Sequence, residues 1–271
     1  MIPASFDYVR AGSLDDAVAL LAEHGDDAKL IAGGHSLLPM MKLRLAFPTV
    51  LIDIRTVPDA AYVRVDGDVV AIGALTRHCD LVASDVLRAE APLIATAAGF
   101  VGDPQIRHRG TIGGSLSHAD PAADLPTAVL ASDAVLVVLG PDGRREIPVA
   151  DFFAGYFETA LAPGEVLAEI RVPRTGPNGY HYEKFVRRAN DWAIVAVATV
   201  AGRVALANMA ATPVRAAATE AALAAGASAA EAAALAAEGT QPIQDMHANQ
   251  EYRGHLATVL TRRGLNAAGI A

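Results

Sequence analysis

The chain has 271 residues, 52% of them hydrophobic, which suits one or two domains with a buried core. A net charge of −8 excludes a broad basic surface for nucleic acid, although backbone N–H groups can still bind a local anion. The single cysteine, Cys79, excludes an intrachain disulfide and an iron–sulfur cluster held by this chain alone. No apolar run reaches the ~20 residues of a membrane-spanning helix and no signal-peptide pattern opens the chain, so we expect a soluble, cytoplasmic protein.

The first part of the chain predicts a compact βαβ-like unit. Its helix formers and apolar runs alternate around one Gly-Gly turn, Gly33-Gly34. The predicted elements are a helix at 15–23 capped by Ser13, a strand at 29–32, a helix at 36–45 that contains Pro39, and a strand at 49–54.

The next part predicts antiparallel strands and helices. Asp66-Gly67-Asp68 is a hairpin turn between strands 62–65 and 69–72. A helix follows at 84–100, then a segment rich in Gly, Pro, His and Asp at 101–127, and strands at 134–139, 145–148 and 166–172. Residues 173–179 are rich in Pro and Gly and form the best linker in the chain, so we place a domain boundary near residue 177.

The last part predicts a three-stranded antiparallel meander followed by helices. The strands are expected at 180–186, 193–200 and 203–209, and Pro213 opens an alanine-rich helical tail. The fold class is therefore α+β.

Two Gly-Gly segments are candidates for an anion site. The first, Ala32-Gly33-Gly34-His35-Ser36, lies between a strand and a helix, where glycines let backbone approach a ligand. The second is Thr111-Ile112-Gly113-Gly114-Ser115, which could hold the other side of the same anion, such as a pyrophosphate. Each segment alone also fits an ordinary tight connection, and neither matches GxGxxG or a Walker A sequence.

Polar side chains follow the second glycine segment. His118, Asp120 and Asp124 could form a metal site, but their spacing matches no helical ligand pattern and prolines interrupt it. Asp124 fits better as an acceptor for ribose hydroxyls, and turn or cap chemistry accounts for at least one of the acids.

Lys184 and Trp192 are candidates in the last part of the chain. A lysine on a strand is usually solvated, and a lone Trp usually packs in a core. Their position at the start of the second domain suggests a surface that faces the first. There Lys184 could stabilise negative charge on a reduced cofactor, and Trp192 could stack on a planar ring.

Taken together, these segments resemble the flavin-binding medium subunit of molybdenum hydroxylases, the xanthine dehydrogenase family, over essentially the whole chain. Within it, the opening residues and the His35 version of the first loop are most similar to medium subunits of aerobic carbon monoxide dehydrogenases. The matching pieces are Ile2-Pro3 with Phe6-Asp7-Tyr8, residues 32–37 with Pro39-Met40-Met41-Lys42, residues 111–115, Asp120-Pro121 through Asp124, and Gly164-Glu165 through Pro173.

The resemblance implies a two-subdomain FAD-binding fold of the vanillyl-alcohol oxidase (PCMH) type over 1–176, with subdomains of about 1–58 and 59–176. It implies a small C-terminal domain, 177–271, with a three-stranded sheet and helices. The implied residues for non-covalent FAD are Ile31, Ala32, Gly33, Gly34, His35, Ser36, Leu37, Val101, Thr111, Ile112, Gly113, Gly114, Ser115, Asp124, Leu167, Lys184 and Trp192.

The implied role is electron transfer. A large partner subunit carries the molybdenum cofactor, a small one carries two [2Fe–2S] clusters, and this chain passes electrons through FAD to a quinone, NAD or oxygen. The resemblance also implies a dimer of heterotrimers, in the cytoplasm or held at the inner face of the membrane through the complex. No catalytic residue and no metal ligand is then expected in this chain.

Several alternatives stay open at this stage. The chain could serve a xanthine, aldehyde or aromatic hydroxylase, because the large subunit decides the substrate. It could be a free-standing flavin oxidase with FAD bonded to His35, although Ile31 stands where such oxidases tend to carry arginine. It could also be a non-enzymatic scaffold that binds another phosphate ligand.

Overall fold

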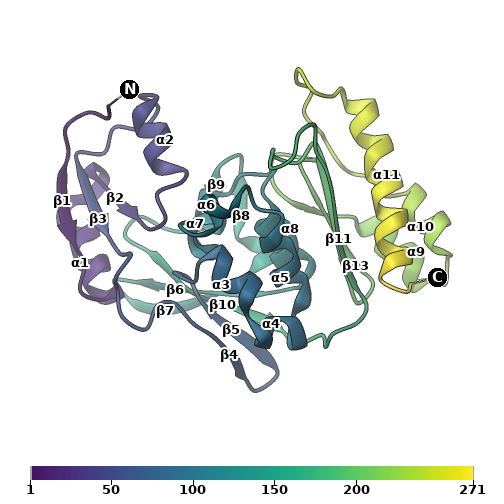
Figure 1. Cartoon of the computed structure of the whole chain (residues 1–271), viewed down its shortest axis with the longest axis horizontal. Helices are drawn as coiled ribbons and strands as arrows, with labels where there is room; N and C mark the ends of the chain where they lie inside the picture. The colour runs from purple at the N-terminus through teal and green to yellow at the C-terminus, as the bar shows by residue number, and fades with distance from the viewer. Residues whose placement is uncertain (1, 271) are drawn as a thin grey trace.

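A computed structural model describes residues 2–270 as three larger β-sheets and one two-stranded sheet, with helices between and beside them (Figure 1). The first sheet, at the N-terminal end, is parallel and has the order β1-β3-β2. Its strands are β1 (Asp7–Arg10), β3 (Val50–Asp53) and β2 (Ala28–Ile31), and its helices are α1 (Leu14–His24) and α2 (Leu37–Lys42). The predicted βαβ unit is therefore confirmed.

Helix α1 begins and ends where its sequence predicts. The Ser13 side chain accepts a hydrogen bond from the backbone N–H of Asp16 at 3.0 Å, which caps the first turn. Gly25 ends the helix with a φ of 55°, a value that favours glycine. Ala17 and Val18 bury the inner side of the helix against the first sheet.

The second sheet is antiparallel, with the order β4-β5-β10-β6-β7. Its strands are β4 (Val63–Asp66), β5 (Val69–Gly73), β10 (Val166–Pro173), β6 (Val135–Gly140) and β7 (Gly143–Pro148). Between β7 and β10 the chain forms a short separate hairpin of β8 (Phe153–Gly155) and β9 (Glu158–Thr159). The hairpin predicted at 62–72 is confirmed as β4 and β5.

Helices cover one face of the second sheet and form the largest core with it. They are α3 (His78–Ala83), α4 (Asp85–Glu90), α5 (Pro92–Gly99), α6 (Pro104–Arg107), α7 (Ile112–His118) and α8 (Asp124–Ala131). The single helix predicted at 84–100 is wrong, because Ala91 leaves helical geometry and Pro92 opens a new helix at its first position. The segment 101–127, rich in Gly, Pro, His and Asp, contains α6, α7 and the start of α8.

The third sheet is antiparallel and has four strands in the order β11-β12-β13-β14. They are β11 (Tyr180–Phe185), β12 (Val195–Val200), β13 (Arg203–Ala207) and β14 (Val214–Arg215). The meander of β11 to β13 is confirmed, but the prediction of three strands is wrong. β14 has two residues next to Pro213, too few to give a strand pattern.

The third sheet lies between two layers of helices (Figure 1). One face packs on α5 and α8, and its residues belong to the same core as the second sheet. The other face packs on α11 (Gln250–Ala267) and α9 (Ala217–Ala224), and α10 (Ala229–Ala234) packs against these two helices in the same core. Strand β12 is therefore buried along its whole length. Within residues 2–270, no helix is long and apolar enough to cross a membrane.

Candidate functional site

A cleft of about 1020 Å³ brings together residues from all three sheets and their loops. Every residue predicted to bind the cofactor lines this cleft except Ile31 and Ile112. Ile31 and Ile112 are 8% and 0% exposed, and their side chains pack in hydrophobic cores. Their side chains therefore contribute to the stability of the fold.

The two glycine loops meet in the wall of the cleft. A Cβ on Gly33 would overlap the carbonyl oxygen of Arg109, so the first loop touches the residues just before the second. A Cβ on Gly113 would lie 2.6 Å from the Cβ of Ala74, so the second loop touches the chain that leaves β5. Glycine at both positions is required by these close approaches.

The loops differ in the hydrogen-bond donors that they offer. In the second loop, the N–H of Ile112 donates to Thr76, that of Gly113 to Ala74, and that of Gly114 to the Thr111 side chain. In the first loop, the N–H groups from Gly33 to Ser36 donate to no atom of residues 2–270. Consecutive free N–H groups are suited to an anion, so the first loop is the better phosphate site.

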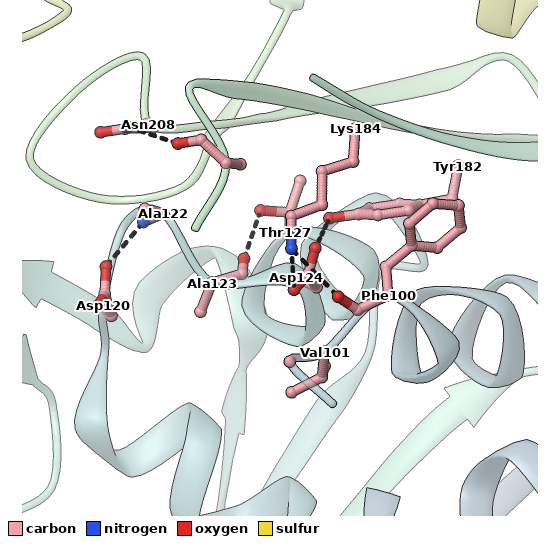
Figure 2. A network of polar contacts seen from close by, with 12 residues as sticks. Phe100, Val101, Asp120, Ala122, Ala123, Asp124, Thr127, Tyr182, Lys184 and Asn208 are labelled. Atoms are coloured by element: carbon pink, nitrogen blue, oxygen red, sulfur yellow. Dashed lines mark hydrogen bonds and ion pairs between the residues drawn. The ribbon is translucent and has the colours of Figure 1, made fainter. Parts of the chain in front are cut away.

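A buried polar cluster joins the third sheet to the helices (Figure 2). Asp124, at the start of α8, accepts hydrogen bonds from the Tyr182 hydroxyl at 2.7 Å and from Lys184 Nζ at 2.9 Å. Lys184 Nζ also donates to the carbonyl oxygen of Phe100 at 3.1 Å, and the rings of Phe100 and Tyr182 lie 5.4 Å apart. The Lys184 and Asp124 side chains are only 4% and 3% exposed. Lys184 is therefore buried, unlike most lysines on strands, which point into solvent.

Burial raises the pKa of Asp124, while the Lys184 charge and the Tyr182 hydroxyl oppose the rise. Each Asp124 oxygen already accepts one hydrogen bond from a side chain. The carboxylate therefore has only its remaining lone pairs to offer to a ligand hydroxyl. Its role toward a sugar stays a prediction.

The other polar residues after the second loop have local partners. Asp120 accepts a hydrogen bond from the backbone N–H of Ala122 at 2.8 Å, which is the predicted turn chemistry. The His118 ring lies 4.9 Å from the Phe157 ring. Within residues 2–270, no three His, Cys, Asp or Glu side chains gather as a metal site would require.

Trp192 lies on the rim of the cleft. It follows β11 in the loop that leads to β12, and its side chain is 60% exposed. An exposed indole beside a cleft is available to cover a planar ligand, which a core Trp would not be.

Sequence reasoning missed a buried polar side chain of the cleft, His78. It is the first residue of α3, it lines the cleft and it is 4% exposed. No local pattern marks it, because it packs against Gly110, which is far away in sequence.

The chain matches two sequence families in tandem. The family described as the FAD binding domain in molybdopterin dehydrogenase matches residues 4–175, and the CO dehydrogenase flavoprotein C-terminal domain matches residues 180–268. The chain belongs to the FAD-binding family of the molybdopterin dehydrogenases.

Individual relatives agree over nearly their whole length. The carbon monoxide dehydrogenase medium chain of Hydrogenophaga pseudoflava is 42% identical, and the match covers 99% of this chain and 98% of that one. Subunit alpha of the 6-hydroxypseudooxynicotine dehydrogenase complex of Paenarthrobacter nicotinovorans is 38% identical, with 99% and 96% covered.

Solved structures of the family agree as well. Carbon monoxide dehydrogenase from H. pseudoflava, solved in a form that lacks the Mo-pyranopterin moiety, is similar with a TM-score of 0.95 and 44% identity, over 100% of both chains. The fold expected from the resemblance, a two-subdomain FAD-binding part and a small C-terminal sheet domain, is thereby confirmed, apart from the fourth strand of the last sheet.

The residues of the cleft suit FAD. The free N–H groups of the first loop fit phosphate oxygens, and the close approach of Gly33 to the backbone of Arg109 and Gly110 holds this loop beside the second one. Val101 and Leu167 add apolar surface, and Lys184 adds an ammonium group that is paired with Asp124. The chemistry of the residues that line the cleft therefore agrees with the family assignment from sequence.

Proposed function

We propose that this chain is the FAD-binding electron-transfer subunit of a molybdenum-containing hydroxylase. The observation that carries the proposal is a large cleft in which residues from both glycine loops, from 101, 124 and 167, and from 184 and 192 meet. FAD would supply a carrier that accepts and releases electrons. We also propose the division of the chain into 1–176 and 177–271, with subdomains at about 1–58 and 59–176.

The chain's own residues would bind, orient and shield this cofactor. The N–H groups of Gly33 to Ser36 would hold the diphosphate, and the hydroxyls of Thr111 and Ser115 would lie on its other side. Lys184, fixed by Asp124, would place a positive charge near the ring system and so favour its reduced, negatively charged form. Trp192 would cover an exposed face of the ring.

For the substrate of the holoenzyme we propose carbon monoxide. Two carbon monoxide dehydrogenase medium chains are 42% and 41% identical to this chain, and this similarity supports the proposal. Medium subunits that serve xanthine, aldehyde or aromatic hydroxylases have the same fold, so the purified complex should be assayed with carbon monoxide, xanthine and aldehydes in parallel. Turnover of carbon monoxide alone is the expected result.

The proposed partners are a large subunit with the molybdenum cofactor and a small subunit with two [2Fe–2S] clusters, assembled as a dimer of heterotrimers. With one cysteine, this chain cannot hold such clusters itself. Leu43, Leu45 and Phe47 are 62%, 69% and 63% exposed, which supports a protein contact at the end of α2. The proposed acceptor is a quinone, NAD or oxygen, and the proposed location is the cytoplasm or the inner face of the membrane.

The first experiment is a visible spectrum of the co-purified complex before and after acid denaturation. We expect flavin and iron–sulfur absorption in the complex and free FAD in the supernatant. A complex without flavin would refute the assignment. Flavin that stays with the precipitated protein would point to a bond at His35 and to the free-standing oxidase.

A further inference from the structure

His78 is held against Gly110, directly before the second glycine loop, by contacts that only the tertiary structure creates. Its backbone N–H donates to the carbonyl oxygen of Gly110 at 3.0 Å. Its ring lies against the same residue, since a Cβ on Gly110 would be 2.7 Å from both Nε2 and Cδ2 of His78. The lack of a side chain at Gly110 therefore makes room for the imidazole in the wall of the cleft.

Neither nitrogen of the imidazole has a hydrogen-bond partner within residues 2–270. Nδ1 is fully buried and unpartnered. Nε2 makes no hydrogen bond either, and it is absent from the fully buried unpartnered atoms, so it is the nitrogen that remains accessible. A buried polar group without a hydrogen-bond partner lowers the stability of the folded protein by about 1–3 kcal/mol, so an unpartnered imidazole in a ligand cleft calls for an explanation.

The surroundings of His78 keep its ring neutral. Burial lowers the pKa of His78 to about 4, and the charges of His35 and Arg107 act in the same direction. A neutral imidazole carries one proton. When that proton is on Nε2, the buried Nδ1 is unprotonated, and the ring has one N–H donor on its accessible side.

We propose that His78 is an FAD-contacting residue whose Nε2–H donates a hydrogen bond to a diphosphate oxygen of the cofactor. The inference rests on the proposed function, because it needs FAD in the cleft. Gly110 links the imidazole to the first loop, because its Cα would lie 2.8 Å from a Cβ on Gly33 while the His78 ring packs against the same residue. His78 and the first loop line the same cleft, so the imidazole and the free N–H groups can serve the same acceptor. His78 then adds a side-chain donor on the side where the N–H groups of the second loop are already engaged.

The test uses the co-purified complex from which FAD has been removed. Binding of FAD, and of ADP as a probe with the diphosphate but no flavin, is measured for the native complex and for His78→Leu and His78→Gln. We expect His78→Leu to weaken both ligands at least tenfold, and His78→Gln, which keeps an N–H donor, to recover part of the loss. His255→Leu, an exposed change on α11, should leave both dissociation constants unchanged.

A second readout separates binding from folding. His78→Leu removes an unsatisfied nitrogen, so the melting temperature of the FAD-free complex should not fall. If His78→Leu binds FAD and ADP as tightly as the native complex, or loses FAD affinity but keeps ADP affinity, the inference is wrong. If the native complex binds no FAD at all, the proposed function itself fails.

Discussion

Lys184 Nζ lies 2.9 Å from Asp124 Oδ2, and this buried ion pair joins strand β11 to helix α8. The pair connects two segments that the sequence separates by a linker, at the place where both border the cleft (Figure 2). Because each charge depends on the other for compensation, the pair couples the docking of the third sheet to the geometry of the cofactor site.

Replacing Lys184 should therefore destabilise the protein strongly. Lys184→Met leaves Asp124 buried without its cation, and we expect the free energy of unfolding to fall by about 3 kcal/mol at pH 7. The loss should shrink toward pH 5, because the pKa of Asp124 is already raised by burial and a protonated Asp124 carries no charge. Denaturant titrations at both pH values measure this. Lys42→Met, an exposed change, is the control, and an equal loss in both variants would contradict the role of the pair.

Gly33→Ala should disturb the contact between the two glycine loops. The new Cβ would overlap the backbone carbonyl of Arg109, so one loop must shift at a cost of about 1–3 kcal/mol. We expect less FAD in the purified complex and a lower melting temperature. Gly99→Ala is a matched control in helix α5, because its Cβ would meet no atom within 4 Å. Equal flavin content in the two variants would show that the loop contact does not matter for binding.

Trp192 is the only tryptophan of the chain, so its fluorescence reports on one place. If it covers the flavin ring, FAD binding should quench the Trp emission. Trp192→Ala should weaken FAD binding about two- to tenfold, the range expected for a lost aromatic contact of about 0.5–1.5 kcal/mol, while Trp192→Phe should lose less. Unchanged affinity in Trp192→Ala would remove Trp192 from the proposed cofactor contacts.

Asp53 should make stability depend on pH in the acid range. The residue is fully buried at the end of β3, where burial favours a higher pKa, but hydrogen bonds from Arg55 and Tyr8 outweigh this and lower the pKa to about 2. The ionised form is therefore stabilised on folding. Its contribution of about 1–2 kcal/mol is complete above about pH 4 and is lost as the pH falls toward 2.

Asp53→Asn should accordingly be less stable than the native chain at pH 7, with a difference that narrows below pH 4. Denaturant titration at pH 7 and at pH 3 measures the two differences. Asp142→Asn, in the exposed turn between β6 and β7, should change stability little at either pH. A difference for Asp53→Asn that stays constant with pH would show that the carboxylate charge contributes nothing.

Local signals predicted much of the secondary structure. Ser13 and the amphipathic pattern after it were enough for α1, and Asp66-Gly67-Asp68 was enough for the hairpin, because caps and tight turns depend on residues close in sequence. Local signals gave the wrong secondary structure where residues close in sequence do not decide the conformation. Pro92 starts a helix instead of interrupting one, and β14 exists only because its two residues pair with β13.

The sequence by itself determined the family, and through this resemblance it predicted that both glycine loops and the residues at 101, 124, 167, 184 and 192 would share one site; the structure places them in one cleft. Only the tertiary structure decided which of these residues face the cleft, that Lys184 is paired with Asp124, and that His78 packs against Gly110 in the wall of the cleft. It also decided that the N–H groups of the first loop are free while those of the second are engaged. The physical reason is that burial and hydrogen-bond satisfaction depend on atoms brought close by folding, and no local pattern records those atoms.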